Sequence, residues 1–174
     1  MDRNQVRAFE TFVNESGDAL LRTATLLTSD RHAAEDVYQE TLHRLFVRWS
    51  RVDNPRAFCR RVMHNLVIDL ARAMHRRPRE LQLLDNHDRN DPRSGDPASA
   101  AELRPTVLAA LDTLTAHQRA IVVLRYFEDR SQDEVAQILG ISPGTVSRTA
   151  SRAVAHLRAQ PGLVTLFADA ATNS

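Results

Sequence analysis

The chain has 174 residues and a net charge of +1, and its 43% hydrophobic content is enough for one or two globular domains with real cores. Five glycines and few β-branched runs argue against sheets, so we expect an all-α protein. The only cysteine, Cys59, excludes an internal disulfide framework and indicates a reducing compartment. No apolar run approaches the roughly 18 residues of a membrane helix, and the first residues lack a signal peptide, so we expect a cytoplasmic protein.

Helical periodicity predicts a four-helix domain over residues 1–79. Apolar side chains recur at steps of three and four residues in four segments, which are 9–13, 20–27, 30–49 and 54–75. Asp30 and Asn54 supply N-cap oxygens, and Pro55 suits the first turn of the fourth helix. A unit of this size can bury a modest core of its own.

Charge is segregated along this first domain. Residues 1–43 carry a net charge of −4, whereas residues 44–79 carry ten arginines against Asp53 and Asp69, a net charge of +8. A block of this kind is the electrostatic footprint of a protein that binds a polyanion. The plain alternative is a solvated basic face.

Residues 80–102 predict a flexible acidic linker. Pro92, Gly95 and Pro97 interrupt any periodicity, and residues 80–103 carry a net charge of −4. The composition alone indicates a tether between two domains.

Periodicity resumes at Leu103 and predicts a second helical domain over residues 103–174. Pro105 lies near the start of one helix, and Thr115 with Gln118 has the spacing of a capping box at the start of another. After residue 160 we expect only a short packing helix and a frayed tail.

The most specific motif is a pair of short helices joined by a tight turn. Ser131 and Glu134 form a second predicted capping box, and Gly140 favours the left-handed backbone that ends a helix. Ser142 and Pro143 then begin the next helix at once. The apolar residues spaced to pack the two helices together are Val135, Ala136, Leu139, Ile141 and Val146. Such a helix-turn-helix usually places its second helix in a DNA major groove, and the alternative is an ordinary helical hairpin.

Motifs for catalysis and for metal or cofactor binding do not occur. The sequence has no Gly-rich phosphate loop, no Cys-x-x-Cys pair and no histidines at zinc-site spacing. We therefore expect no catalytic residues, no metal site and no cofactor.

Three segments in this order resemble the extracytoplasmic-function (ECF) sigma factors of the sigma-70 family, nearest to an actinobacterial sigma-E-like subgroup. The first segment is AEDVYQETLHR at 34–44, the second is NPRAFCRRVMHNLVID at 54–69, and the third is the helix-turn-helix with its preceding helix. Together with the acidic linker they span nearly the whole chain.

The resemblance implies that the first segment faces the clamp helices of the polymerase β′ subunit. An acidic and amide-bearing face suits a basic coiled coil. The residues assigned to this contact are Asp36, Gln39, Glu40, Leu42 and Arg44. The alternative is that they are ordinary solvent-exposed helix residues.

The resemblance also implies that the second segment and the loop before it open the promoter −10 element. Bases of the non-template strand would leave the stack while arginines hold phosphates. The residues assigned to this contact are Arg51, Asp53, Asn54, Arg60, Arg61, Asn65, Arg72, Arg76 and Arg77. Asn65 has the donor and acceptor to read a base edge. Trp49 and Phe58 sit at apolar helical spacing, so we expect core packing rather than base stacking.

By the same resemblance, the second helix of the helix-turn-helix meets the −35 element. The residues assigned to base or phosphate contacts are Thr145, Ser147, Arg148, Thr149, Ser151 and Arg152. Val146, Ala150, Val154 and Leu157 are expected to face inward. Relatives commonly carry basic residues where this chain has Ser147 and Thr149, and serine where it has Arg148.

The resulting hypothesis is an alternative sigma factor with no catalytic activity of its own. The resemblance implies as partners core RNA polymerase, through the β′ clamp helices and the β flap, promoter DNA and, as in many relatives, an anti-sigma factor, with no membrane contact. It also implies that the acidic linker threads the polymerase active-site cleft. The main alternative is an autonomous helix-turn-helix regulator of duplex DNA. A nucleic-acid-processing enzyme would need a metal-binding carboxylate cluster, which the sequence does not offer.

Overall fold

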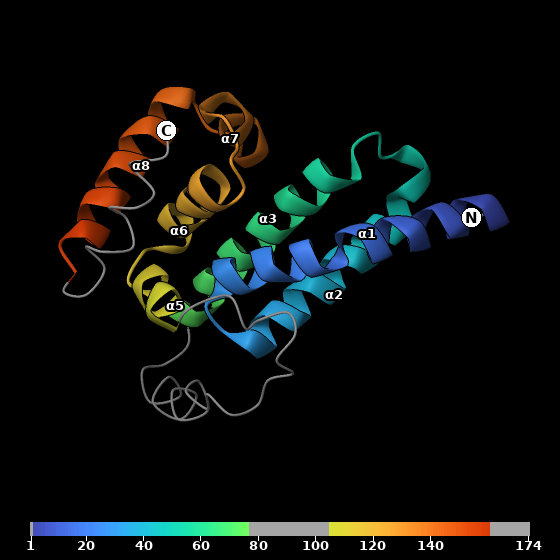
Figure 1. Ribbon diagram of the computed structural model, residues 1–174, viewed down its shortest axis with the longest axis horizontal. Helices are drawn as coiled ribbons and strands as arrows, with labels where there is room; N and C mark the ends of the chain where they lie inside the picture. The colour runs from blue at the N-terminus through green and yellow to red at the C-terminus, as the bar shows by residue number, and fades with distance from the viewer. Residues whose placement is uncertain (1, 77–104, 161–174) are drawn as a thin grey trace. The chain divides into compact units, whose positions relative to one another are not determined.

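The computed structural model describes residues 2–76 and 105–160, and within these ranges every regular element is helical (Figure 1). Contacts divide the chain after Glu102 into two compact units. The predicted all-α fold class is confirmed. The predicted linker and the carboxy-terminal tail lie outside the described residues.

Among residues 2–76, the amino-terminal unit holds three long helices and one short 3-10 helix (Figure 1). These elements are α1 (Arg3–Thr28), α2 (Arg31–Arg48), η1 (Trp49–Arg51) and α3 (Pro55–Arg76). Asp30 Oδ1 accepts a hydrogen bond from the Ala33 amide at 2.7 Å, and Asn54 Oδ1 accepts one from the Ala57 amide at 3.1 Å. Both predicted N-caps are confirmed, and each satisfies an amide that a helix start leaves without a partner.

The long helices bury a common apolar core. Burial of each large aliphatic side chain stabilises the fold by about 1.5–3 kcal/mol. The buried apolar residues include Leu20, Ala24, Leu27, Ala34, Val37, Leu45, Cys59, Met63 and Val67.

One continuous helix, α1, replaces the two helices that the sequence predicts before residue 28. The prediction of two helices is wrong because the polar residues 14–18 interrupt the apolar stripe without interrupting the helix. Ser16 and Gly17 are buried, so small side chains continue the packing face where large apolar ones stop. Among residues 2–76, the fourth helical element is therefore η1, and α1 is unbroken.

Gly17 allows a close approach between α1 and Tyr38 of α2. A Cβ on Gly17 would lie 2.9 Å from Tyr38 Oη, closer than real Cβ contacts allow. In a helix interior, alanine in place of glycine usually raises the free energy of unfolding by about 1 kcal/mol. We expect Gly17→Ala to show no such gain in the wild-type chain, because of the clash with Tyr38 Oη, and to show it when Tyr38→Phe removes that oxygen. Urea unfolding of the wild type, both single variants and the double variant measures this coupling. Equal effects of Gly17→Ala in the two backgrounds would contradict the contact.

The carboxy-terminal unit contains four α-helices and one π-helical turn among residues 105–160. These elements are α5 (Pro105–Asp112), α6 (Ala116–Val122), η2 (Val123–Phe127), α7 (Gln132–Leu139) and α8 (Pro143–Arg158). The sequence predicts an ordinary α-helix through Leu124, but the α-helix changes to a π-helix after Val122. The amide of Glu128 bonds the Val123 carbonyl five residues earlier at 3.0 Å, which is the π-helical pattern.

The predicted helix-turn-helix is formed by α7 and α8. Ser131 Oγ accepts from the Glu134 amide at 3.2 Å, and Glu134 Oε2 accepts from the Ser131 amide at 2.8 Å. Gly140 ends α7 with a φ of +67°, in the left-handed region. Ser142 Oγ accepts from the Thr145 amide at 3.2 Å and begins α8. The predicted signals at all these helix ends are confirmed.

A small apolar core joins α7 and α8 to α6 and η2. Its buried members are Ile121, Leu124, Val135, Ala136, Val146 and Ala150, with Ile138, Leu139 and Ile141 packed against them. The packing predicted from the sequence is confirmed, and it holds α8 as a rigid part of the unit.

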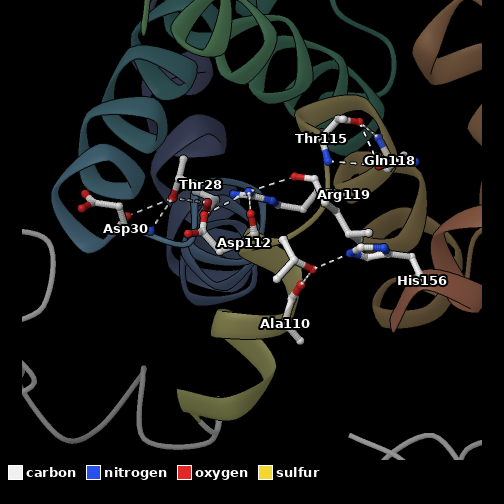
Figure 2. A network of polar contacts seen from close by, with 11 residues as sticks. Thr28, Asp30, Ala110, Asp112, Thr115, Gln118, Arg119 and His156 are labelled. Carbon is white, nitrogen blue, oxygen red and sulfur yellow. Dashed lines mark hydrogen bonds and ion pairs between the residues drawn. The ribbon is translucent and has the colours of Figure 1, made fainter. Parts of the chain in front are cut away.

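Polar contacts fix the ends of α5 and α8 (Figure 2). Arg119, only 8% exposed, donates to Asp112 Oδ1 at 3.1 Å and to the carbonyl oxygens of Asp112 and Leu114 at 3.3 Å. Burial lowers the pKa of Arg119, and the Asp112 carboxylate opposes this shift. At the far end of α8, His156 Nε2 lies 3.2 Å from Thr113 Oγ1. The helix α8 is therefore tied to the turn after α5 as well as to α7.

Candidate nucleic-acid interface

The exposed face of α2 brings together three of the residues assigned to the polymerase. Asp36 and Gln39 are exposed and Glu40 is half-exposed, on the side opposite a buried face. That buried face consists of Ala34, Val37, Thr41 and Leu45. The remaining two assigned residues, Leu42 and Arg44, are partly buried. Because they are two positions apart, they lie on opposite edges of the exposed face.

An ion pair orders part of this face. Glu40 Oε1 lies 2.7 Å from Arg44 Nε, one helical turn away, and both side chains are nearly half-exposed. An exposed pair of this kind adds little to stability. Its effect on the surface is to hold one carboxylate and one guanidinium at a fixed position.

Phe46 and Val47 continue the same face and were missed from the sequence. Their exposed fractions are 43% and 66%, large for apolar residues. The sequence places Phe46 in the apolar stripe of the helix, but in the structure it lies on the side away from the buried residues of α2, where the Phe9 ring contacts it and still leaves it 43% exposed. The sequence spacing could have identified them. Phe46 and Val47 follow Gln39 and Glu40 by seven residues, or two helical turns, and therefore lie on the same face. The face is therefore polar at its middle and apolar at its carboxyl end.

The loop between α2 and α3 carries three of the residues assigned to the −10 element. Arg51, Asp53 and Asn54 are exposed. The oxygen of the Asn54 side chain is already engaged as the cap of α3, so its amide NH₂ is the group left for a ligand. Trp49, which precedes the loop, packs against two aromatic rings of α1, as the core-packing prediction requires.

On α3, Arg61, Asn65 and Arg72 lie along one exposed face. The opposite face, with Cys59 and Met63, is buried. Asn65 Oδ1 lies 3.3 Å from His64 Nδ1, so the ring nitrogen donates when it carries the proton.

The other basic residues of this segment differ in how far their side chains are exposed. Arg60 is partly buried, and its charge partly opposes the upward shift that burial gives the pKa of the Cys59 thiol. Arg48 and Arg56 are exposed and were not assigned to DNA. Both contribute to the excess positive charge of residues 44–79, but that charge count does not single them out. The side chain of Arg76 and all of Arg77 lie outside the described residues.

The outer face of α8 carries the residues assigned to the −35 element. Four of them are exposed and two, Thr145 and Thr149, are partly buried. The exposed four are Ser147, Arg148, Ser151 and Arg152. The Thr145 hydroxyl lies 2.9 Å from Ser142 Oγ, so it also takes part in the N-cap.

The inner face of α8 follows the prediction with one change. Val146, Ala150 and Leu157 are buried as expected, but Ala153 is fully buried where Val154 is only partly so. The helix therefore turns its small residue, and not the valine, toward the core.

Residues 2–76 and 105–160 hold no cluster of three or more His, Cys, Asp or Glu side chains placed to bind a metal ion. Over the same ranges, no helix is both long and apolar enough to cross a membrane. Cys59 is fully buried, and burial raises its pKa to about 12, with Arg60 opposing the shift. Its thiol therefore stays protonated at neutral pH.

Two family models match the chain, one for sigma-70 region 2 over residues 12–77 and one for sigma-70 region 4 over residues 105–157. An RNA polymerase sigma-E factor of Streptomyces antibioticus is 37% identical over 161 residues, which cover 91% of this chain and 87% of the relative. The ECF RNA polymerase sigma factor SigL of Mycobacterium tuberculosis is 32% identical over 149 residues, which cover 83% and 84%.

Similar solved structures include the sigma factor RpoE of Bartonella quintana in complex with the anti-sigma factor NepR. That similarity has a TM-score of 0.67 at 26% identity and covers 87% of this chain and 95% of that one. CnrH, solved with the cytosolic domain of CnrY, has a TM-score of 0.60 at 26% identity and covers 88% and 86%.

Proposed function

Because the chain belongs to the ECF sigma factors of the sigma-70 family, we propose that its two helical units divide promoter recognition between them. The protein is an alternative sigma factor, which serves RNA polymerase in transcription initiation. Residues 1–79 would bind polymerase and the −10 element, and residues 103–174 would bind the −35 element. One observation supports this division. On α2, α3 and α8, most of the side chains assigned to partners lie on faces opposite the buried ones.

The exposed face of α2 would bind the β′ clamp helices. Asp36, Gln39 and Glu40 offer charge and hydrogen-bond acceptors to a basic surface, and Leu42 and Arg44 flank them. Phe46 and Val47 would add an apolar contact, because burying exposed apolar surface favours association. This mixed face suits a partner that is basic along one part and apolar at one end.

The loop after η1 and the exposed face of α3 would hold the melted −10 strand. Asn65 would read a base edge, and Arg51, Arg61 and Arg72 would contact phosphates. Asp53 and Asn54 would help frame the pocket for the captured base. Arg48 and Arg56, exposed beside this loop, extend the same basic surface.

The outer face of α8 would read the −35 element in the major groove. Arg148 and Arg152, one turn apart, can each reach a guanine edge or a phosphate, and Ser147 and Ser151 lie beside them on the same face. Because only two of the six residues assigned to this face are arginines, the affinity for −35 duplex should depend weakly on salt.

Replacing Arg148 with alanine should weaken binding to a −35-containing promoter about tenfold, because a bidentate arginine–guanine contact contributes about 1–3 kcal/mol. Arg148 is exposed and its Nε bonds only its own helix, at the Gly144 carbonyl, so folding should be preserved. Holoenzyme binding to promoters with each −35 base changed in turn measures the affinity and the specificity lost. Arg158→Ala, an equal charge change near the end of α8, is the control. Equal losses for the two variants would contradict a specific contact.

The remaining partners follow from the family. We infer that the chain acts in the cytoplasm, where core polymerase is found, and that it has no catalytic activity of its own, as its relatives are sigma factors. Because RpoE of Bartonella quintana was solved with an anti-sigma factor, we also propose that an anti-sigma factor binds this chain.

Transcription by purified actinobacterial core polymerase on fragmented genomic DNA, with and without the protein, tests the proposal directly. Mapped RNA 5′ ends should reveal new start sites that share paired −35 and −10 motifs. The rival hypothesis, an autonomous helix-turn-helix regulator, predicts no new start sites and tight duplex binding without polymerase.

A further inference from the structure

Four aromatic rings form a cluster near the start of the loop assigned to the −10 element, and they belong to Phe9, Phe12, Phe46 and Trp49. The Trp49 ring lies 5.3 Å from the Phe9 ring in an edge-to-face arrangement, and 5.7 Å from the Phe12 ring. Phe9 also meets Phe46 edge-to-face at 5.2 Å. These spacings are the favourable ones for aromatic pairs. Two side chains one turn apart on α1 are thus packed against Trp49, the first residue of η1.

The loop is otherwise lightly held on the α2 side. The turn of η1 is closed by a long hydrogen bond, from the Val52 amide to the Trp49 carbonyl at 3.3 Å. At the other end, Asn54 anchors the loop to α3 through its side chain and through its carbonyl, which accepts from the Phe58 amide at 3.0 Å. Between these anchors Arg51 and Asp53 are exposed. The position of Trp49 therefore decides where the loop begins.

We propose that Phe9 and Phe12 are positioning residues for capture of the −10 strand. They touch no DNA in this scheme. They hold Trp49 against the end of α2, and so hold the loop in the conformation that frames the captured base. This inference rests on the proposed function of the loop and α3, and it assigns a promoter-melting role to the first turns of α1.

The reason for a positioning role is preorganisation. A strand-capture pocket that is already formed costs less ordering when the base enters, so binding to the melted strand is stronger. Without the rings, the loop would sample other conformations and the melted state would be less populated.

The chain offers its own reporter, because Trp49 is the single tryptophan. Phe12→Leu and Phe9→Leu should each make Trp49 fluorescence in the free full-length protein more accessible to quenching by acrylamide. With saturating core polymerase, each should lower the fraction of open promoter complexes about threefold to tenfold, the equivalent of losing one aromatic pair. Phe12→Leu is the cleaner variant because the contact between Phe9 and Phe46 stays in place.

Two further variants separate positioning from stability. Phe12→Tyr keeps the ring and should restore both readouts. Leu27→Val shortens a buried side chain of the same helix about 27 Å from Phe9, and should change neither readout below its melting temperature. If Leu27→Val reproduces the effects of Phe12→Leu, the positioning role is wrong.

Asn65→Ala distinguishes failure of this inference from failure of the proposed function. If Asn65→Ala lowers open-complex formation but both leucine variants match the wild type, the aromatic rings do not position the loop. If none of the three variants affects melting, the assignment of α3 to the −10 element falls as well.

Discussion

Replacing Asn65 with alanine should reduce promoter melting about tenfold to a hundredfold while the affinity for core polymerase stays unchanged. Asn65 is exposed on α3, and its amide group offers a donor and an acceptor to a base edge, which alanine lacks. Alanine is also the stronger helix former, so α3 should persist. The only internal contact that the variant loses within residues 2–76 is the 3.3 Å bond with His64.

Permanganate footprinting of the promoter, with polymerase binding measured in parallel, separates melting from assembly. Asn14→Ala, the same substitution at an exposed position of α1, is the matched control and should behave like the wild type. If the Asn65 variant transcribes normally from a natural promoter, the base-capture role of this residue is wrong.

Replacing Asp36 with arginine should weaken core polymerase binding at least about a hundredfold, because like charges facing each other across an interface cost several kcal/mol. Asp36 is exposed on the acidic face of α2, and arginine is the better helix former, so the fold should tolerate the change. Titration of labelled protein with core polymerase measures the affinity.

The matched control is Glu15→Arg, which makes the same charge change at an exposed position of α1. Added salt should reduce the difference in affinity for core polymerase between the Asp36 variant and the wild type, because salt screens the repulsion between like charges. A comparable loss for both variants would point to net charge and not to the α2 face.

The helix ends were predictable from the sequence because the signals are local. The N-cap residues each accept a hydrogen bond from an amide three residues away, and Gly140 adopts a left-handed conformation that glycine favours by itself; the caps are Asp30, Asn54, Ser131 and Ser142. The predicted helix-turn-helix followed from these signals together with the apolar spacing between them.

The continuity of α1 was not predictable in this way. The buried Gly17 lies against Tyr38, twenty-one positions along the chain, and no local pattern records such a contact. Periodicity alone indicated a break because small buried residues resemble a polar interruption.

The apolar end of the α2 face was missed for a related reason. Periodicity tells which side of a helix a residue occupies, but not whether another helix covers that side at that height. Phe46 and Val47 lie on the side of α2 away from its buried residues, and they stay exposed although the Phe9 ring of α1 packs against Phe46. Arg48 and Arg56 were missed because charge counts over a segment do not separate one arginine from another.

The division of α8 into two faces bears on how promoter specificity changes during evolution. The buried residues Val146, Ala150, Ala153 and Leu157 pack this helix, whereas the exposed residues Ser147, Arg148, Ser151 and Arg152 contribute nothing to the core. Substitutions at those exposed positions should therefore be nearly neutral for folding, since surface changes away from caps and cores usually are. Duplicated copies of such a gene can diverge toward new regulatory targets without first acquiring compensating mutations.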